Sequence, residues 1–338
     1  MKLSYLSILS MLLISILILS GCKQKAPIVG ILIHSYDDKD KNYLVENLTK
    51  MGAEVELKEA DNDKGKQIIQ AHELIDGGAK VLIIVSINQD ESAKIVEYAH
   101  KKNVKVIAYD RMIEGCQLDY YVSSNSLDYY VSTNTKNIGE MQATYLTSLS
   151  PKGTYALICG SRYDNNSMKL FNGHMNVLQQ FMENGDIQVV YSEFTDDWSA
   201  SQGSFHTNQI LDKYPDITAI IAGNDEIADG VIATLKERGL EGKVMVAGQN
   251  AELDNVRSII HGEQTCTILK PLKEMAEVTA EIATSIAFDR PLTVKFTTES
   301  NGKALIKSVI LDATLVCKNN IETTILATGY YISSQLNQ

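Results

Sequence analysis

The 338-residue sequence lacks the short motifs that commonly mark an enzyme active site. It has no Gly-x-Gly-x-x-Gly, no phosphate-binding loop, no Gly-x-Ser-x-Gly and no His-Glu-x-x-His. Its six histidines lack the spacing of metal ligands. We expect His34, at the end of the first strand, to face a cleft, and the others to be solvated or to cap helices. The sequence therefore indicates no catalytic residue, no cofactor and no metal.

Cysteine is also scarce. Apart from Cys22 near the N-terminus, the chain has Cys116, Cys159, Cys266 and Cys317, which are far apart and show no disulfide framework or Cys-x-x-Cys spacing. Outside the cytoplasm such cysteines can pair. However, two of them lie in or beside apolar runs, so that we expect buried free thiols.

A basic surface is missing as well. The chain carries 31 Lys and Arg against 42 Asp and Glu, a formal net charge of -11. Nucleic acids and anionic lipids require a basic face, so neither is expected as a main partner. An apolar content of 44% and a charged content of 22% fit a soluble globular protein with well-formed cores, and the length is enough for two domains.

The N-terminus carries an apolar run that is short for a membrane-spanning helix. Lys2 precedes residues 3–19, which are almost wholly apolar or serine, and small residues follow. This arrangement is typical of a secretory signal. The sequence Leu19-Ser20-Gly21-Cys22 resembles a bacterial lipobox, which implies cleavage before Cys22 and a lipid on its sulfur. The alternative is an uncleaved anchor, and both place the protein outside the cytoplasm, tethered to a bacterial membrane.

Short β-branched runs alternate with helical patterns along the rest of the chain. We expect strands at residues 28–33, 55–57, 81–85, 104–109, 155–159, 189–191, 217–222, 244–247, 266–269 and 309–316. Helices are expected between them, with none in the tail. Near-continuous apolar strands joined by helices are typical of a parallel sheet covered on both faces. Two such series predict an α/β fold with two doubly wound, Rossmann-like lobes.

Polar side chains and one indole follow the predicted strands, where doubly wound sheets bind their ligands. The candidate ligand-binding residues are Asp110, Arg111, Asp164, Asn166, Trp198, Asn224, Asn250 and Lys270. Sugar hydroxyls need both donors and acceptors, and an indole offers a flat partner to the C–H face of a sugar ring. Asp and Asn also cap helices and form turns, but their recurrence at successive strand ends favours a sugar or polyol site.

Several segments carry a family resemblance: VIAYDRMI at 106–113, DNN…KLF at 164–171, AGNDEIADG at 222–230, VAGQNAEL at 246–253, TILKPL at 267–272 and the tail CKNNIETTILATGYY. They resemble the periplasmic sugar-binding proteins of the ribose, galactose and xylose type, and most closely the D-xylose-binding branch that serves ABC importers. The resemblance covers most of residues 27–338. It implies a periplasmic binding protein type I fold, with two lobes joined by three crossings.

The resemblance also implies a function. A monosaccharide, D-xylose or a similar aldose, is captured when the lobes close and is delivered to the membrane permease of an ABC importer; a monomer is expected. By position, Asp110 and Arg111 hold hydroxyls from the first lobe, and Trp198 stacks on the sugar ring. The second lobe contributes Asp164, Asn166 and Asn224, and Lys270 lies near the return crossing.

The sequence departs from the family pattern in three places. The loop after the first strand is short and lacks the Trp and Arg of relatives, so either Tyr36 or Lys39 substitutes or that wall of the site is open. Asn250 stands where relatives have Asp, which changes the hydroxyl pattern that the site can read. One residue more than expected lies between Asp164 and Lys169.

Two other functions use the same residues. A sugar-sensing lipoprotein that feeds a membrane histidine kinase or a chemoreceptor has an identical pocket, and differs only on its outer surface. A periplasmic enzyme acting on sugars uses Asp110 and Asp164 as acid and base.

One nine-residue segment is repeated almost unchanged: LDYYVSSNS at 118–126 is followed by LDYYVSTNT at 127–135. Relatives carry one copy, at the first crossing between the lobes. Either copy suits a strand, and the other is a tolerated duplication or a tyrosine-bearing loop that covers the cleft. The expected organisation is a signal peptide at 1–21, a tether at 22–27, lobe one at 28–118 and about 270–304, the duplicated hinge segment at 119–135, and lobe two at 136–269 and about 305–338.

Overall fold

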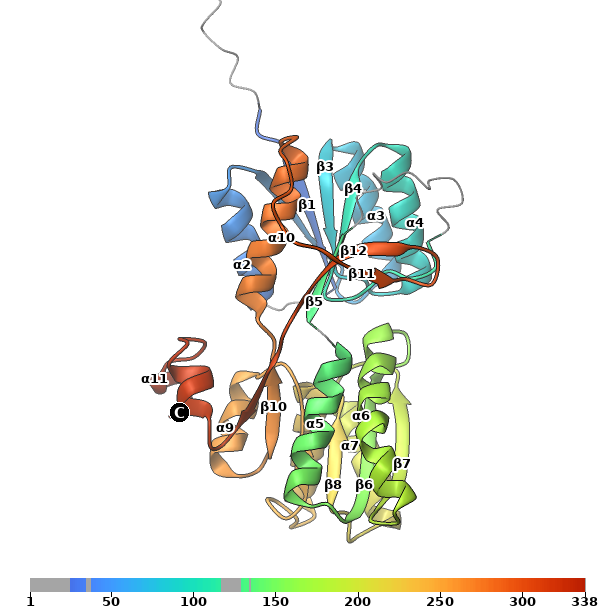
Figure 1. Cartoon of the computed structure of the whole chain (residues 1–338), viewed down its shortest axis with the longest axis vertical. Coiled ribbons are helices and arrows are strands. Elements are labelled where there is room, and N and C mark those ends of the chain that lie inside the picture. The colour runs from blue at the N-terminus through green and yellow to red at the C-terminus, as the bar shows by residue number, and fades with distance from the viewer. Residues whose placement is uncertain (1–24, 35–37, 117–128, 134, 338) are drawn as a thin grey trace, which may run out of the picture.

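The computed structural model describes residues 25–34, 38–116, 129–133 and 135–337. These residues form two α/β lobes, one above the other, each built on a mostly parallel sheet with helices on both faces (Figure 1). The predicted fold class is therefore confirmed.

The first lobe contains a seven-stranded sheet of order β11-β12-β5-β4-β3-β1-β2. Its strands are β1 (Ile28–Ile33), β2 (Glu54–Glu59), β3 (Ala79–Ile84), β4 (Lys105–Tyr109), β5 (Tyr129–Thr133), β11 (Thr297–Ser300) and β12 (Leu305–Leu311). Its helices are α2 (Asp38–Lys50), α3 (Lys64–Asp76), α4 (Gln89–Lys101) and α10 (Leu272–Ala287). The apolar faces of α2 and α10 pack on one side of the sheet and those of α3 and α4 on the other, which leaves the strand ends to face the second lobe (Figure 1).

The second lobe contains a six-stranded sheet of order β13-β10-β9-β8-β6-β7. Its strands are β6 (Gly153–Ser161), β7 (Ile187–Thr195), β8 (Ala219–Ala222), β9 (Met245–Ala247), β10 (Cys266–Leu269) and β13 (Thr314–Cys317). Its helices are α5 (Thr135–Leu149), α6 (Asn165–Glu183), α7 (Ala200–Lys213), α8 (Asp225–Glu237) and α9 (Leu253–His261). The tail adds the π-helix η1 (Glu322–Leu326) and α11 (Ser333–Leu336), which pack near α9 and β13. The expectation of a tail without helix was wrong because these turns are too short to show a period.

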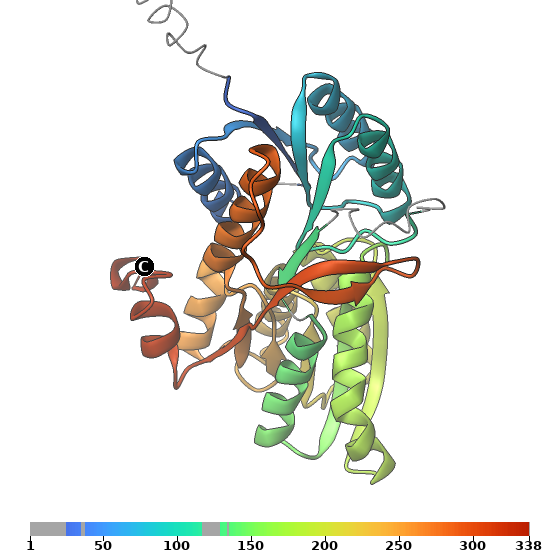
Figure 2. The ribbon, with the colours of Figure 1, turned by 45° about the horizontal axis from the view of Figure 1, so that its top comes forward.

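The chain passes between the two sheets at three places, after β5, after β10 and after β12. Figure 2 shows these connections close together between the lobes. The expected boundary near residues 304 and 305 lies too early, because β12 belongs to the first sheet, where Lys307–Leu311 pairs with β5. The predicted strand 309–316 covers parts of two strands, β12 in the first sheet and β13 in the second. The prediction joined them because apolar residues continue through the connection between the lobes.

The second copy of the repeated segment forms β5. This strand lies between β4 and β12 and is parallel to both. The first copy, 118–126, lies outside the described residues. The second copy therefore supplies the strand that leads to the first crossing.

Helices α5 and α6 tie the second lobe's strand ends together through a buried histidine. His174 is 2% exposed, and its Nε2 lies 2.7 Å from Oε1 of Gln142. The Gln142 amide donates to the Gly248 carbonyl at 2.8 Å and to the Ala222 carbonyl at 3.3 Å. Burial lowers the pKa of His174 to about 3. The expectation of a solvated histidine is wrong here, because neutral imidazole fits a dry, hydrogen-bonded site.

The four cysteines after Cys22 are buried and free, as predicted. In the part of the chain that the structure describes, every helix is too short or too polar to cross a membrane. Among the same residues, no group of His, Cys, Asp and Glu side chains is arranged to hold a metal ion.

Deletion of residues 118–126 is expected to preserve the fold, because the second copy already forms β5. Loop-closure entropy changes slowly with loop length, so the stability should change by less than about 1 kcal/mol. Thermal unfolding followed by circular dichroism measures this. A midpoint lowered by ten degrees or more would show that the first copy is needed for folding.

The stability of the folded chain should fall as the pH is lowered from about 6.5 towards 3, in part because of His174. In this window the His174 side chain is protonated in the unfolded state and neutral in the folded state. This difference lowers the free energy of unfolding by up to about 1.4 kcal/mol for each pH unit. His174→Gln keeps a hydrogen-bonding amide beside Gln142 but has no group that titrates. We expect its free energy of unfolding to depend less steeply on pH, by the contribution of one proton, whatever its stability at pH 7. Urea unfolding across the window measures the slope, with the exposed His261→Gln as the control. An unchanged slope in His174→Gln contradicts the prediction.

Candidate functional site

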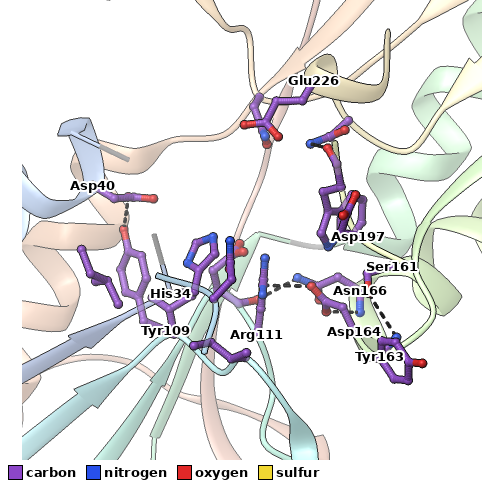
Figure 3. A pocket seen from close by; sticks show the side chains of 18 of the residues that line it. His34, Asp40, Tyr109, Arg111, Ser161, Tyr163, Asp164, Asn166, Asp197 and Glu226 are labelled. Carbon is purple, nitrogen blue, oxygen red and sulfur yellow. Dashed lines mark hydrogen bonds and ion pairs between the residues drawn. The ribbon is translucent and has the colours of Figure 1, made fainter. Parts of the chain in front are cut away.

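A cavity of about 1100 Å³ lies between the two lobes (Figure 3). Every predicted ligand-binding residue that the structure describes borders it: His34, Lys39, Asp110, Arg111, Asp164, Asn166, Trp198, Asn224, Asn250 and Lys270. Tyr36 and the proposed lipidation site Cys22 lie outside the described residues. Strand ends that are far apart in the sequence therefore meet at one cavity.

Two ion pairs form the deep part of the cavity. Lys270, on the second crossing, places Nζ 2.9 Å from Oδ1 of Asp110, at the end of β4. Arg111 places Nε 2.9 Å from Oδ2 of Asp164, in the other lobe, and these side chains are only 14% and 4% exposed. The side-chain amide of Asn166, in the second lobe, donates to the backbone carbonyl of Asp110, in the first lobe, at 3.2 Å. Both lobes and one crossing thus share a single polar cluster.

The electrostatics of this cluster favour a neutral ligand. Burial alone raises the pKa of Asp110, but the Lys270 ammonium and then Arg111 hold it below its usual value. Burial lowers the pKa of Lys270, but Asp110 outweighs this effect and raises it. Burial, with Arg111 beside it, lowers the pKa of His34 to about 3. Two carboxylates therefore face two cations and a neutral imidazole, which leaves no net charge for an ionic ligand to balance.

The backbone adopts left-handed conformations at two candidate residues. The φ angle is +59° at Asp110, +109° at Asn250 and +53° at Ala251. Each such residue costs about 1–3 kcal/mol, and such strain tends to collect at functional sites. Asp and Asn tolerate this region better than most residues do, whereas Ala251 needs other contacts to hold it there.

Trp198 packs closely on two glycines. A Cβ at Gly160 would lie 2.0 Å from the indole ring, and a Cβ at Gly223 would lie 3.1 Å from it. The ring therefore rests on bare backbone while it borders both the core and the cavity. Its Nε1 is buried and has no hydrogen-bond partner among the described residues. Trp198 is therefore both a residue of the core and part of the cavity wall.

Two candidate residues also cap helices, as the structural interpretation of strand-end Asp and Asn requires. Oδ1 of Asp164 accepts a hydrogen bond from the backbone N–H of Asn166 at 2.9 Å, which leaves Oδ2 for Arg111. Asn224 accepts from the Ile227 amide at 2.9 Å and donates to the Trp198 carbonyl at 3.3 Å. Capping therefore fixes these side chains at the edge of the cavity.

Other polar residues at the cavity were missed: Asp40, Tyr109, Ser161, Tyr163, Asp197, Glu226 and Gln249. Figure 3 shows Asp40 and Tyr109 on one side of the space and Glu226 and Asp197 on the other. The Tyr109 hydroxyl donates to Asp40 at 2.5 Å, which connects β4 to α2. The position of Tyr109 as the last residue of a strand was the signal that could have identified it.

Comparison with known proteins agrees with this architecture. Residues 29–290 match the family model described as "Periplasmic binding protein domain". The chain is 33% identical over 299 residues to the D-xylose-binding periplasmic protein of Escherichia coli K12, covering 88% of each chain. It is 32% identical to the protein of the same description from Haemophilus influenzae, covering 88% of this chain and 87% of that one.

A solved structure is similar over almost the whole chain. It is an ABC transporter solute-binding protein from Clostridium phytofermentans with bound β-D-glucose, with a TM-score of 0.81 and 25% identity. The match covers 91% of this chain and 99% of that one. Since the family match spans both lobes and the cavity lies between them, the chain belongs to the periplasmic binding protein family and is a binding protein rather than an enzyme.

Proposed function

We propose that this chain is a lipid-anchored extracytoplasmic binding protein that captures a monosaccharide and delivers it to an ABC permease. D-xylose or a similar aldose is the proposed ligand. The observation that carries the proposal is the inter-lobe cavity, where ion-paired carboxylates and cations, amides and one indole from both lobes converge. The names of the xylose-binding and glucose-bound relatives support the choice of a sugar.

The chemistry of the site suits vicinal hydroxyls. Each hydroxyl donates one hydrogen bond and accepts others, so it inserts between a carboxylate and a cation and satisfies both. Bonds to charged groups are the stronger kind and provide the affinity. The Trp198 ring would cover an apolar face of the sugar, because an indole presents a large, flat apolar surface. A neutral sugar makes these contacts without leaving either buried ion pair unbalanced.

Closure of the lobes follows from the size of the cavity. About 1100 Å³ exceeds the usual range of small-molecule pockets, and a monosaccharide is smaller than most drug-sized ligands. A sugar bound at the Arg111–Asp164 pair touches both lobes, and closure would bring the remaining walls of the cavity onto it. The ligand shifts the equilibrium towards the closed state by its higher affinity for that state.

The anchoring and delivery parts of the proposal rest on the N-terminus and the family. The Leu19–Cys22 sequence matches a lipobox, and a lipid on Cys22 would hold the protein beside a membrane permease. A binding protein tethered at the membrane surface encounters its permease at high effective concentration.

Calorimetric titration with D-xylose, D-ribose, L-arabinose, D-glucose and D-galactose tests the ligand. We expect D-xylose to bind most tightly and D-xylonate, its anionic acid, to bind far more weakly, because Arg111 and Lys270 in the polar cluster are already paired with carboxylates. Absence of heat with every sugar would remove the monosaccharide proposal. Tighter binding of another aldose would correct the identity of the sugar only.

Asp110→Asn and Asn224→Asp should each weaken sugar binding by about tenfold or more, because each replaces a group that contacts hydroxyls in the proposed complex. Both replacements tolerate the local backbone: Asn accepts the left-handed conformation at 110, and Asp retains the helix cap at 224. Calorimetry measures the affinity, and thermal unfolding checks the fold. Glu183→Gln, on the exposed end of α6, serves as the control. Wild-type affinity in both site variants would refute the assignment of the site.

A further inference from the structure

Two tyrosines of the C-terminal tail contact the loop that carries Asn250. The Tyr330 hydroxyl donates to the Asn250 carbonyl at 3.4 Å, and the Tyr331 hydroxyl donates to the Ala251 carbonyl at 3.1 Å. Tyr331 is 4% exposed and belongs to the cluster that fixes the tail on α9 and β13. The two rings pack edge to face, with centroids 4.9 Å apart. The tail is therefore a fixed part of the second lobe.

The loop that these hydroxyls hold is strained. Asn250 and Ala251 both have positive φ angles, a conformation that alanine in particular avoids. On the amide side, Asn250 donates to the Ile268 carbonyl at 2.8 Å and Ala251 donates to Thr267 Oγ1 at 3.2 Å. The hydroxyls of the two tyrosines donate to the carbonyl groups of the same two residues. Hydrogen bonds at both faces thus keep Asn250 at the edge of the cavity.

The same rings receive a cation from the other lobe. Lys39, in the first turn of α2, places Nζ 3.8 Å from the centroid of the Tyr330 ring and 3.7 Å from that of Tyr331. Figure 1 shows α11, at the end of this tail, below α2. An ammonium over aromatic faces is attracted by the ring quadrupoles, most strongly where water is excluded. Lys39 and Asn250 both border the cavity, so this contact lies at its rim.

We propose that Tyr330 and Tyr331 are positioning residues with two separable actions. Their hydroxyls fix the Asn250 loop in the conformation that meets the ligand, and their rings bind Lys39 to form a latch between the lobes. The first action deepens the proposed sugar-binding function and rests on it for its affinity readout. The second action belongs to the ligand-free chain.

The hydroxyl action is tested with Tyr331→Phe, which keeps the ring over Lys39 and removes one hydrogen bond to the strained loop. We expect faster amide hydrogen exchange in residues 249–252 and sugar affinity about three- to tenfold lower, as for the loss of one buried hydrogen bond. Tyr98→Phe, which loses a hydroxyl bond to Asp76 on the surface of the first lobe, is the matched control. Unchanged exchange and affinity in Tyr331→Phe would overturn this action.

The latch is tested with Lys39→Met, which keeps the length of the side chain and removes its charge, and with Lys39→Arg, which keeps the charge. Small-angle scattering of the ligand-free protein should give a larger radius of gyration for Lys39→Met and the wild-type value for Lys39→Arg and Tyr331→Phe. Identical scattering of Lys39→Met and wild type would overturn the latch. If the wild type binds no sugar, the proposed function fails, while exchange and scattering still decide the two actions of the tyrosines.

Discussion

The buried ion pairs between the lobes are the constraint on which the rest of the structure depends. Asp110 faces Lys270 and Arg111 faces Asp164, and each of these charges would be costly to bury alone. Their pairing brings the end of β4, the second crossing and the start of α6 to one point. The fold must therefore supply two sheets whose strand ends face each other, with the crossing between them. The same pairing gives the cavity strong donors and acceptors and adds no net charge to it.

A third buried carboxylate, Asp225, connects the elements that carry the site. Asp225 follows Asn224 and accepts from Thr267 Oγ1 at 2.8 Å, from Gln264 Nε2 at 3.0 Å and from the Glu252 amide at 3.0 Å. These bonds join the start of α8, the strand β10 and the loop after β9, which all carry candidate residues. Burial raises the pKa of Asp225 to about 8 in spite of the three donors. The three donors hold this carboxylate in place, so that hydrogen bonds fix the start of α8 against β10 and the loop after β9.

The strand-end residues were predictable from sequence because parallel sheets place their carboxyl ends at one edge. The apolar runs identified the strands, and the polar residues after them identified the cavity. Contacts between distant segments were not predictable in this way. The period of 309–316 cannot show that its strand changes sheet, and no pattern relates Lys39 to Tyr330 and Tyr331. Nor can sequence show positive φ at Ala251, since alanine favours other conformations and only its neighbours hold it there.

The partners of Lys39 alter the interpretation of the shortened loop after β1. The family resemblance implies a longer loop here, with a Trp and an Arg that cover the sugar, and the sequence left three alternatives open: Tyr36 or Lys39 replaces them, or that wall of the site is open. The Lys39 ammonium lies over two aromatic rings of the tail. The tyrosines also hold the loop of Asn250, the position at which the family resemblance implies Asp. Two of the departures from the family pattern therefore meet at one rim of the cavity. A change in ligand preference should be sought at this rim rather than at the cluster of ion pairs.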